Sequence, residues 1–226
     1  MTAGGLDQHG RDLGGAGPDR DRALVTALSL GAAFALLTAA ATTGLTLSVD
    51  RRVILALGAG QSVTLIPVMA AASWLASGMA AIPLALLLAL LLYRRNGRRT
   101  AWLYVGTCLG GWALNLLLKD LTRRPRPRGI SPRLTAAGFY SFPSGHAMLA
   151  VLVFGFGALL LARTVHRMDA RCGIIGVAAT ITLLASVSRI YLGAHWPTDV
   201  LGGLVAGACW AATCLVAARR WGAAPA

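Results

Sequence analysis

Long runs without a charged residue constrain this chain most. The 25 residues from Ala23 to Leu47 carry no charge, and a second uncharged run covers 41 residues from Val53 to Tyr93. About 20 apolar residues in a helix cross the roughly 30 Å of hydrocarbon in a bilayer, so runs of this length predict membrane spans. Hydrophobic residues form 56% of the sequence and charged residues only 13%, too few to cover a soluble domain. We therefore expect an all-α, polytopic membrane protein.

The number of spans depends on the 41-residue run, which has room for two spans or for one span preceded by an interfacial segment. Its first half is interrupted by glycine, serine and proline, whereas its second half is dense in leucine, which favours one span. Four more apolar segments follow it: Ala101–Leu118, Ala147–Ala162, Gly173–Val187 and Val200–Ala218. The sequence therefore predicts six transmembrane helices rather than seven.

Basic residues orient such a bundle, because positively charged loops stay on the cytoplasmic side. With six spans, 12 of the 21 basic residues fall on the side that holds both termini, whereas seven spans would divide them almost evenly. We expect a multi-pass cell-membrane protein with cytoplasmic termini, a flexible cytoplasmic tail over residues 1–22 and one membrane domain over residues 23–220. Gly202, Gly203 and Gly207 in the last span predict close helix packing.

Three polar stretches lie at span ends on the non-cytoplasmic side. Charges at membrane depth cost roughly 2.5–3.5 kcal/mol each, so such groups need a compensating partner. The first stretch holds Lys119 and Arg126, the second Ser144, Gly145 and His146, and the third Arg189, His195 and Asp199. A phosphoryl group requires donors for its oxygens, a nucleophile and a proton donor, which these residues supply. We expect an oxyanion to bind where the stretches meet.

Two of the stretches also predict local geometry. The second precedes an apolar span, so Ser144 is placed to cap a helix whose free N–H groups would also attract an anion. His195 and Asp199 lie four residues apart and share a face if that stretch is helical, with Pro197 tolerated near the helix start. The carboxylate would then fix the imidazole tautomer and leave the other ring nitrogen facing a substrate. Taken singly, each stretch also has a purely structural interpretation, as a helix cap or a lipid-headgroup anchor.

Together the three stretches resemble the signature motifs of the type 2 phosphatidic acid phosphatase family of membrane lipid phosphatases. The first motif, Lys, six residues and Arg-Pro, is matched by Lys119 and Arg126-Pro127. The second, Pro-Ser-Gly-His, is matched by residues 143–146. The third, Ser-Arg, five residues, His, three residues and Asp, is matched by Ser188-Arg189, His195 and Asp199. The resemblance covers Ala101–Ala218 strongly, and the first hundred residues only through the pattern of spans.

The resemblance implies a role for each matched residue. His195 would be the nucleophile, Asp199 its orienting partner and His146 the general acid for the leaving group. The phosphoryl oxygens would be held by the remaining matched residues: Lys119, Arg126, Ser144, Gly145 and Arg189. Neither a metal nor another cofactor is implied, and three fixed cations can do the neutralising work often given to Mg²⁺.

The function that the resemblance implies is metal-independent hydrolysis of a lipid phosphate through a phosphohistidine, at the non-cytoplasmic interface. Implied substrates are polyprenyl diphosphates such as undecaprenyl diphosphate, phosphatidic acid and phosphatidylglycerol phosphate. Four further arginines favour a diphosphate headgroup: Arg123, Arg124, Arg128 and Arg133. Three aromatic residues are candidates to line the entrance: Phe139, Tyr140 and Trp196.

Other classes stay open at this stage: a non-catalytic protein that binds lipid headgroups, a transporter, or a haloperoxidase that uses vanadate in the same pocket. A transporter is expected to place ionisable groups near the bilayer midplane, whereas these lie at span ends. Nucleic acid is not expected as a partner, because the basic residues flank apolar runs instead of forming an aromatic-lined basic surface. The expected partners are a lipid phosphate substrate and membrane lipids, and the sequence indicates no oligomeric state.

Overall fold

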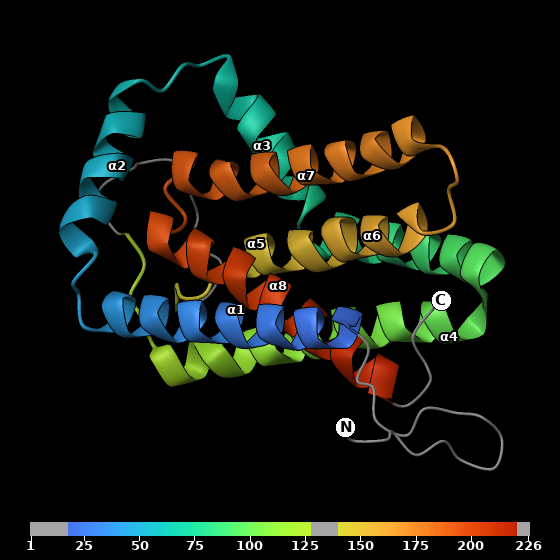
Figure 1. The fold of residues 1–226 in the computed structure, drawn as a ribbon. Coiled ribbons are helices and arrows are strands. Elements are labelled where there is room, and N and C mark those ends of the chain that lie inside the picture. The colour runs from blue at the N-terminus through green and yellow to red at the C-terminus, as the bar shows by residue number, and fades with distance from the viewer. Residues whose placement is uncertain (1–17, 128–139, 221–226) are drawn as a thin grey trace, which may run out of the picture.

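The computed structural model describes residues 18–127 and 140–220, and within these ranges the chain is helical apart from turns and short connections (Figure 1). The elements in chain order are α1 (Pro18–Thr42), α2 (Leu47–Ala59), α3 (Leu65–Leu75), α4 (Gly78–Thr122), α5 (Gly145–Ala150), the π-helical η1 (Val151–Phe156), α6 (Gly157–Ala162), α7 (Met168–Tyr191) and α8 (Pro197–Arg220). The predicted all-α fold is confirmed. Helix α1 begins before the predicted domain start at residue 23, and residues 1–17 of the predicted tail lie outside the described residues.

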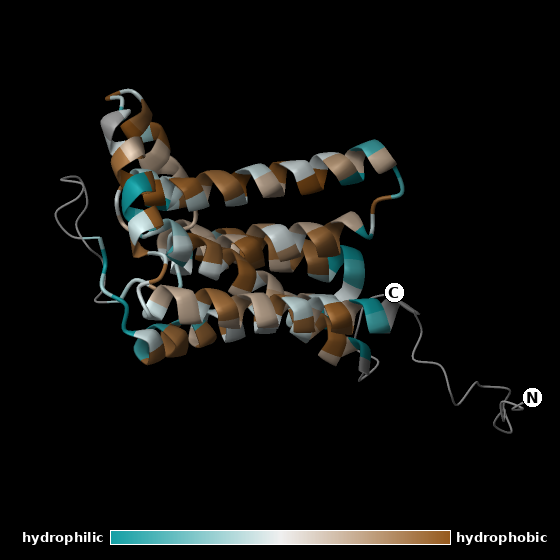
Figure 2. Cartoon of the chain, turned by 60° about the vertical axis from the view of Figure 1, so that its left-hand side comes forward, coloured by the Kyte–Doolittle hydropathy of each residue, from teal (hydrophilic) through white to brown (hydrophobic). Residues whose placement is uncertain are grey.

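Five helical segments of the described chain are long and apolar enough to cross a membrane: Asp21–Thr42, Gly78–Thr122, Gly145–Ala162, Met168–Tyr191 and Pro197–Arg219. The third of these runs continuously through α5, η1 and α6. Large apolar side chains cover the outside of the bundle, with Leu36 73% exposed and Leu86 63% exposed. Hydrophilic residues gather at the two ends of the bundle (Figure 2). Such a surface suits a hydrocarbon environment rather than water.

Helix α4 consists of two helices joined at Gly97, where φ is 83° and ψ is 173°. Glycine suits this position because other residues rarely adopt a positive φ. The chain reverses direction there, so the two halves of α4 are antiparallel along the bundle (Figure 1). Unbroken, its 45 residues would extend about 68 Å, more than twice the hydrocarbon thickness.

Together with the six residues before it, the first half of the long uncharged run forms two short helices, α2 with 13 residues and α3 with 11. At 1.5 Å per residue they are only about 20 and 17 Å long, too short to cross the hydrocarbon layer. Helix α3 packs along α7, and α2 lies beside the end of α7 and the start of α8 at one end of the bundle (Figure 1). These lengths argue against two full spans in this run.

Helix α8 packs against α1, and its glycines that predicted a close approach pack against the start of the α5 to η1 helix. A Cβ atom on Gly203 would lie 2.4 Å from the carbonyl oxygen of Ser144, and one on Gly202 would lie 2.4 Å from the ring of Phe142. At Gly207 the corresponding distance to the carbonyl oxygen of Met148 is 3.1 Å. The predicted packing is confirmed, and it places the start of α8 directly against the start of α5.

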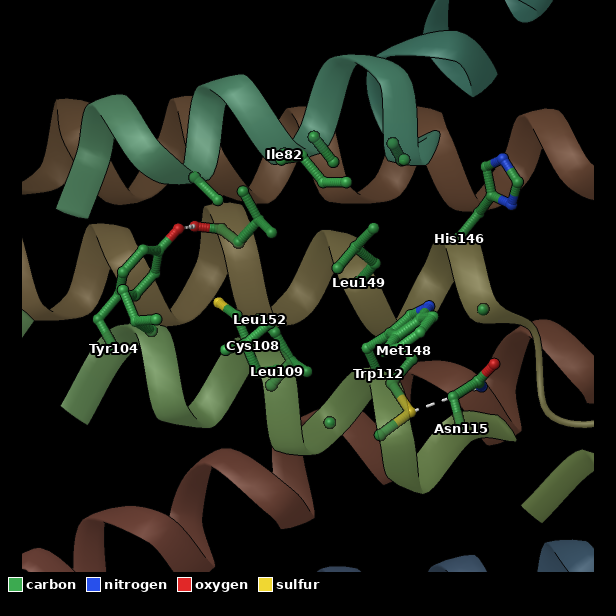
Figure 3. A pocket seen from close by; sticks show the side chains of 18 of the residues that line it. Ile82, Tyr104, Cys108, Leu109, Trp112, Asn115, His146, Met148, Leu149 and Leu152 are labelled. Atoms are coloured by element: carbon green, nitrogen blue, oxygen red, sulfur yellow. Dashed lines mark hydrogen bonds between the residues drawn. The ribbon is translucent and has the colours of Figure 1, made fainter. Parts of the chain in front are cut away.

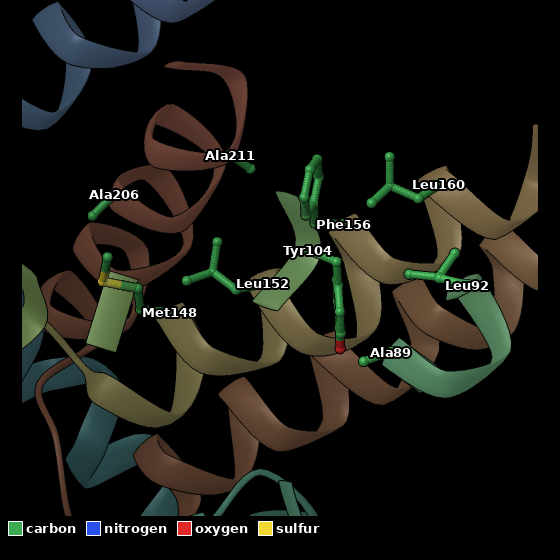
Figure 4. Packing of buried hydrophobic residues seen from close by; sticks show 9 residues of the cluster. All are labelled: Ala89, Leu92, Tyr104, Met148, Leu152, Phe156, Leu160, Ala206 and Ala211. Carbon is green, nitrogen blue, oxygen red and sulfur yellow. The ribbon is translucent and has the colours of Figure 1, made fainter. Parts of the chain in front are cut away.

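A buried apolar cluster fills the middle of the bundle between both halves of α4, the α5 to α6 helix and α8 (Figure 4). Tyr104 is fully buried at its centre, and its hydroxyl donates a hydrogen bond of 3.1 Å to the carbonyl oxygen of Val153. That bond satisfies the one polar group that the tyrosine brings into the core. The cluster fixes α4 against α5, and these are the two elements that carry the first two motifs.

Candidate active site

The three predicted motifs meet at the end of the bundle opposite the Gly97 turn (Figure 1). Lys119 lies in the last turn of α4, and Ser144 immediately precedes α5. Arg189 lies in the last turn of α7, His195 follows in the connection, and Asp199 lies in the first turn of α8. The α5 and α8 starts are joined directly by a hydrogen bond of 2.9 Å from the Ser144 N–H to the carbonyl oxygen of Asp199. Three segments far apart in sequence therefore form one site.

His195 is buried, with 2% of its surface exposed. Its Nδ1 lies 3.5 Å from Oδ2 of Asp199, and its Nε2 lies 3.3 Å from Nη1 of Arg126. Because a guanidinium can only donate, Nε2 is the acceptor and the ring proton belongs on Nδ1, toward the carboxylate. Burial lowers the pKa of His195 to about 4, since desolvation disfavours the imidazolium. The ring is therefore neutral above that pH, and its Nε2 lone pair accepts from Arg126.

Asp199 is fully buried and surrounded by donors. The Trp196 N–H donates to Oδ2 at 2.8 Å, and the Ser141 hydroxyl donates to the same oxygen. Nη1 of Arg124 donates to Oδ1 at 2.7 Å. A carboxylate held by this many donors cannot rotate away from His195. The stretch is helical only from Pro197, so Asp199 lies in α8 and His195 lies just before it.

Two of the predicted phosphate-binding cations, Arg126 and Lys119, interact electrostatically with His195. Lys119 Nζ donates to the carbonyl oxygens of Tyr140 at 3.3 Å and Ser141 at 3.4 Å. Arg126 donates to the carbonyl oxygen of Ala194 at 2.8 Å. Lys119 also interacts electrostatically with Arg126 and Arg189, so the three cations share one neighbourhood. Like charges repel at such a site, and an anion placed between them would relieve that repulsion.

Two buried polar atoms in this cluster have no hydrogen-bond partner within the described residues, Oγ of Ser144 and Nε of Arg189. Ser144 precedes α5 as predicted, but its hydroxyl makes no capping hydrogen bond. Arg189 Nη1 does donate, to the buried hydroxyl of Ser73. Leaving buried polar groups unsatisfied costs about 1–3 kcal/mol each, so both atoms point to a missing acceptor. A phosphoryl oxygen would satisfy both.

Helix α5 presents its first turn to this site. His146 is half-buried and interacts electrostatically with the other groups: His195, Arg189, Arg126 and Lys119. Gly145 precedes it, and a Cβ there would lie 3.0 Å from Oδ1 of Asn115. The glycine therefore lets the helix start approach α4 closely, with its N–H groups at the anion site.

An apolar cavity of about 430 Å³ opens beside His146, between the two halves of α4 and the α5 to η1 helix (Figure 3). Its walls are mostly aliphatic and aromatic, including Ile82, Ala85, Trp112 and Leu149. His146 lies at one end of the lining in Figure 3, and the opposite end reaches Tyr104 in the core. The cavity thus joins the charged cluster to the membrane-embedded part of the bundle.

Several predicted contributors occupy other positions. Arg124 does not face a substrate, because carboxylates hold both ends of its guanidinium, and Arg123 is exposed and pairs with Asp120. Trp196 does not line an entrance; it is buried, and its Nε1 donates to the carbonyl oxygen of Pro125 at 2.9 Å. Tyr140 is half-buried and offers its carbonyl oxygen to Lys119. Arg128, Arg133 and Phe139 lie outside the described residues.

The structure adds residues that the sequence did not single out. Asp50 on α2 pairs with Arg124, Ser141 bonds Asp199, and Ser73 on α3 bonds Arg189. No motif marks them, because each acts through a partner distant in sequence. The one available signal was Asp50, which lies between two uncharged runs, because a charge buried there would require a partner.

The donors that converge here suit an anion rather than a metal ion. The carboxylates of Asp50 and Asp199 are both bound to Arg124. Across residues 18–127 and 140–220, no three potential ligands of the His, Cys, Asp or Glu type gather in one place. The groups that remain for a ligand are guanidinium, ammonium, hydroxyl and N–H donors, all of which bind oxyanions.

Sequence comparison supports the interpretation of this geometry. The PAP2 superfamily model matches residues 99–223. Phosphatidylglycerophosphatase B of Bacillus subtilis is 38% identical over 95 residues, which are 42% of this chain and 46% of that protein. Decaprenylphosphoryl-5-phosphoribose phosphatase of Mycobacterium tuberculosis is 35% identical over 130 residues, 55% of this chain and 64% of that protein. The chain thus spans about half to two thirds of the length of these relatives.

Structural comparison extends the similarity over most of the chain. The crystal structure of the transmembrane PAP2 type phosphatidylglycerolphosphate phosphatase from Bacillus subtilis superposes with a TM-score of 0.77 at 28% identity. The superposition covers 84% of this chain and 94% of that one. Aquifex aeolicus LpxE shares the fold, with a TM-score of 0.56 at 20% identity. With its three motifs assembled at one end of the bundle and the family model matched over its second half, the chain belongs to the PAP2 superfamily.

Proposed function

We propose that this protein is a membrane lipid phosphate phosphatase that works through a phosphohistidine on His195. One observation supports this most directly: within the described residues, Ser144 Oγ and Arg189 Nε are buried without a partner, beside a neutral histidine whose Nε2 accepts from Arg126. A phosphoryl group supplies acceptors for both atoms and an electrophile for the lone pair. A phosphoryl ester would use every group in the cluster.

The first step forms the phosphohistidine. The Nε2 lone pair of His195 bonds to phosphorus while the bond from phosphorus to the lipid oxygen breaks, and His146 gives that oxygen a proton. Asp199 stabilises the positive charge that develops on the imidazole, from its position 3.5 Å from Nδ1. Lys119 and Arg126 hold the phosphoryl oxygens as negative charge spreads over them.

The second step releases phosphate. Water bonds to phosphorus and gives a proton to the now neutral His146, while the bond from nitrogen to phosphorus breaks. Inorganic phosphate leaves, and His195 returns to its neutral form with the Nδ1 proton toward Asp199. This chemistry consumes one water and needs neither a metal nor a redox partner, so we propose a metal-independent hydrolysis.

The substrate we propose is an amphiphile whose tail lies in the apolar cavity. That cavity extends from His146 into the bundle, so a headgroup at the cations and a tail between the α4 halves can be bound together. Its walls suit hydrocarbon, because burying apolar surface is favourable by about 25 cal/mol per Å². The relatives bear names for lipid substrates, including undecaprenyl diphosphate and phosphatidylglycerophosphate. Polyprenyl diphosphates, phosphatidic acid and phosphatidylglycerol phosphate are the candidates.

We propose six membrane crossings in the cell membrane, with the active site on the extracytoplasmic side. The break at Gly97 divides α4 into two crossings, and α2 and α3 are too short to add a seventh. Basic residues mark the end of the bundle opposite the site: Arg22, Arg94, Arg95, Arg98, Arg99, Arg163, Arg167, Arg171 and Arg219. The positive-inside rule assigns that end, and with it the termini, to the cytoplasm.

Phosphate release tests the proposed function. We expect the purified protein in detergent micelles to release inorganic phosphate from at least one of undecaprenyl diphosphate, phosphatidic acid and phosphatidylglycerol phosphate. The rate should be the same with excess EDTA, because the cluster neutralises charge with its own cations. Binding of these lipids without any release would instead indicate a non-catalytic headgroup-binding protein. Loss of activity in EDTA would contradict the metal-independent chemistry.

The tail site predicts a chain-length effect. Ala85→Trp should fill part of the cavity, since Ala85 lines it. Displacing about two methylenes, at ~0.8 kcal/mol each, should raise KM for a long-chain phosphatidic acid about tenfold. Hydrolysis of water-soluble p-nitrophenyl phosphate should not change, because that substrate has no tail.

The matched control is Ala113→Trp, on the exposed outside of α4 and absent from the cavity wall. It should leave KM for both substrates unchanged. If Ala85→Trp impaired the soluble and the lipid substrate equally, the cavity would not be the tail site.

A further inference from the structure

Arg124 lies between two buried carboxylates. Its Nη1 donates to Oδ1 of Asp199 at 2.7 Å, and its Nη2 donates to Oδ2 of Asp50 at 2.7 Å. The three residues are 6%, 0% and 1% exposed. The guanidinium also lies over the Trp196 ring, 5.8 Å from its centroid. Arg124 is therefore fully committed within the protein, although it lies between two motif residues in the sequence.

Asp50 extends this bridge to α2. Its Oδ1 accepts the Thr198 N–H at 2.9 Å and the Thr198 hydroxyl at 2.6 Å, so it caps the first turn of α8. Its Oδ2 accepts from Arg124 and, at 3.0 Å, from the Thr46 hydroxyl. One carboxylate thus holds both the residue next to Asp199 and the arginine that holds Asp199. It comes from a helix outside the region matched by the family model.

Burying three charges requires an explanation beyond stability. Removing ions from water costs several kcal/mol each, and a buried ion pair is often no more stabilising than an apolar replacement. What a two-ended Arg bridge provides is geometry, because the planar guanidinium fixes two carboxylates at set distances and angles. Here one of those carboxylates is the partner of the nucleophile.

We propose that Arg124 and Asp50 are positioning residues for catalysis, which orient Asp199 and thereby His195 through a buried chain from α2 to the nucleophile. This inference rests on the proposed phosphohistidine function. Neither residue touches the substrate; both act through Asp199. Helix α2 is then part of the catalytic unit and not only a connection between spans.

The bridge also sets the pH at which the His195 and Asp199 pair takes up an extra proton. Without the positive charge of Arg124, that pair attracts a proton more strongly, so the acidic limb of the activity profile should move to higher pH. Without the negative charge of Asp50, Arg124 repels that proton more strongly, and the limb should move to lower pH or stay. The other charged groups that face the pair are unchanged in both cases: Lys119, Arg126, His146 and Arg189.

The test measures kcat, KM and pH profiles for Arg124→Gln, Arg124→Lys and Asp50→Asn on a lipid phosphate. We expect kcat to fall about 10- to 100-fold in each, as for other groups that orient a histidine, with KM within about twofold. The acidic limb should rise by about one pH unit in Arg124→Gln and should not rise in Asp50→Asn. Arg124→Lys should keep the wild-type limb but not the wild-type kcat, since one ammonium cannot span both carboxylates.

The neighbouring Arg123 and Asp120 provide matched controls. Arg123→Gln and Asp120→Asn remove the same charges from an exposed pair, whose side chains are 67% and 69% exposed. Both should retain wild-type kcat and pH profile. Helical circular dichroism and thermal unfolding in detergent identify variants that do not fold; if Arg124→Gln is one of them, Asp50→Asn and Arg124→Lys carry the test.

The outcomes distinguish failure of this inference from failure of the proposed function. An inactive wild-type protein would refute the proposed function. An active wild type with folded variants of unchanged kcat and pH profile would overturn the positioning role alone. Lower thermal stability with unchanged kcat and pH profile would also overturn it, because the bridge would then be a structural brace. An acidic limb that rises in Arg124→Gln and does not rise in Asp50→Asn, together with lower kcat in both, supports it.

Discussion

His195→Ala should reduce the turnover of a lipid phosphate by on the order of 10⁴- to 10⁶-fold, as expected when the nucleophile of a covalent mechanism is removed. The alanine variant has no lone pair to attack phosphorus, and the neighbouring His146 cannot replace it because its proposed task is proton transfer. The measurement is single-turnover phosphate release from a radiolabelled lipid phosphate. Rapid quenching into alkali should trap labelled phosphoprotein in the wild type and none in the variant.

The chain offers a matched control for this variant. His166 is exposed in the connection between α6 and α7, at the opposite end of the bundle from the site. His166→Ala removes the same side chain and should leave turnover and phosphoprotein labelling unchanged. Wild-type turnover in His195→Ala would show that another group attacks phosphorus, and the covalent mechanism would have to be abandoned.

The sequence could place the three motifs at helix ends because each motif consists of residues at fixed spacings within one short stretch. Ser144, Gly145 and His146 form one helix start, and Arg189 to Asp199 form one connection between helices. Apolar runs then placed every motif at a span end. Only packing was needed to bring those ends together, and the glycines of α8 indicated that packing as well.

The fold was harder to predict where a single uncharged apolar run contains several helices. The sequence between Val53 and Tyr93 has no charge to mark a boundary, yet it contains most of α2, all of α3 and the first part of α4. Conversely, the turn at Gly97 lies among arginines and is helical on both sides, so its reversal depends on one positive φ value. Hydropathy measures the length of an apolar run and contains little information about where the backbone turns.

The bridge through Arg124 could not be predicted for a different reason. The arginine lies between motif residues, so its positive charge suggested a contact with substrate. The two carboxylates that neutralise it come from α2 and α8, separated from it by 74 and 75 positions in the sequence. Only the folded bundle brings Arg124 to these carboxylates, and no local spacing in the sequence indicates the pairing.

The role of His146 predicts an effect that depends on the leaving group. His146→Ala should lower turnover of phosphatidic acid by roughly 10²- to 10⁴-fold, because the departing alkoxide is a strong base and needs a proton in the transition state. With p-nitrophenyl phosphate the departing phenolate is stable without a proton, so the same variant should lose much less. The ratio of the two losses isolates proton transfer from any general disturbance of the site.

That ratio also separates His146 from the cations beside it. Arg189→Lys should impair both substrates to a similar degree, since its proposed contact is with the phosphoryl oxygens that the two substrates share. If His146→Ala behaved like Arg189→Lys, with equal losses on both substrates, the imidazole would be a phosphate ligand and the general acid would have to be another group. A selective loss on phosphatidic acid makes His146 the proton donor, and since proton donation and attack must act on opposite sides of one phosphorus atom, it would also show that α5 and the connection before α8 face a single bound headgroup.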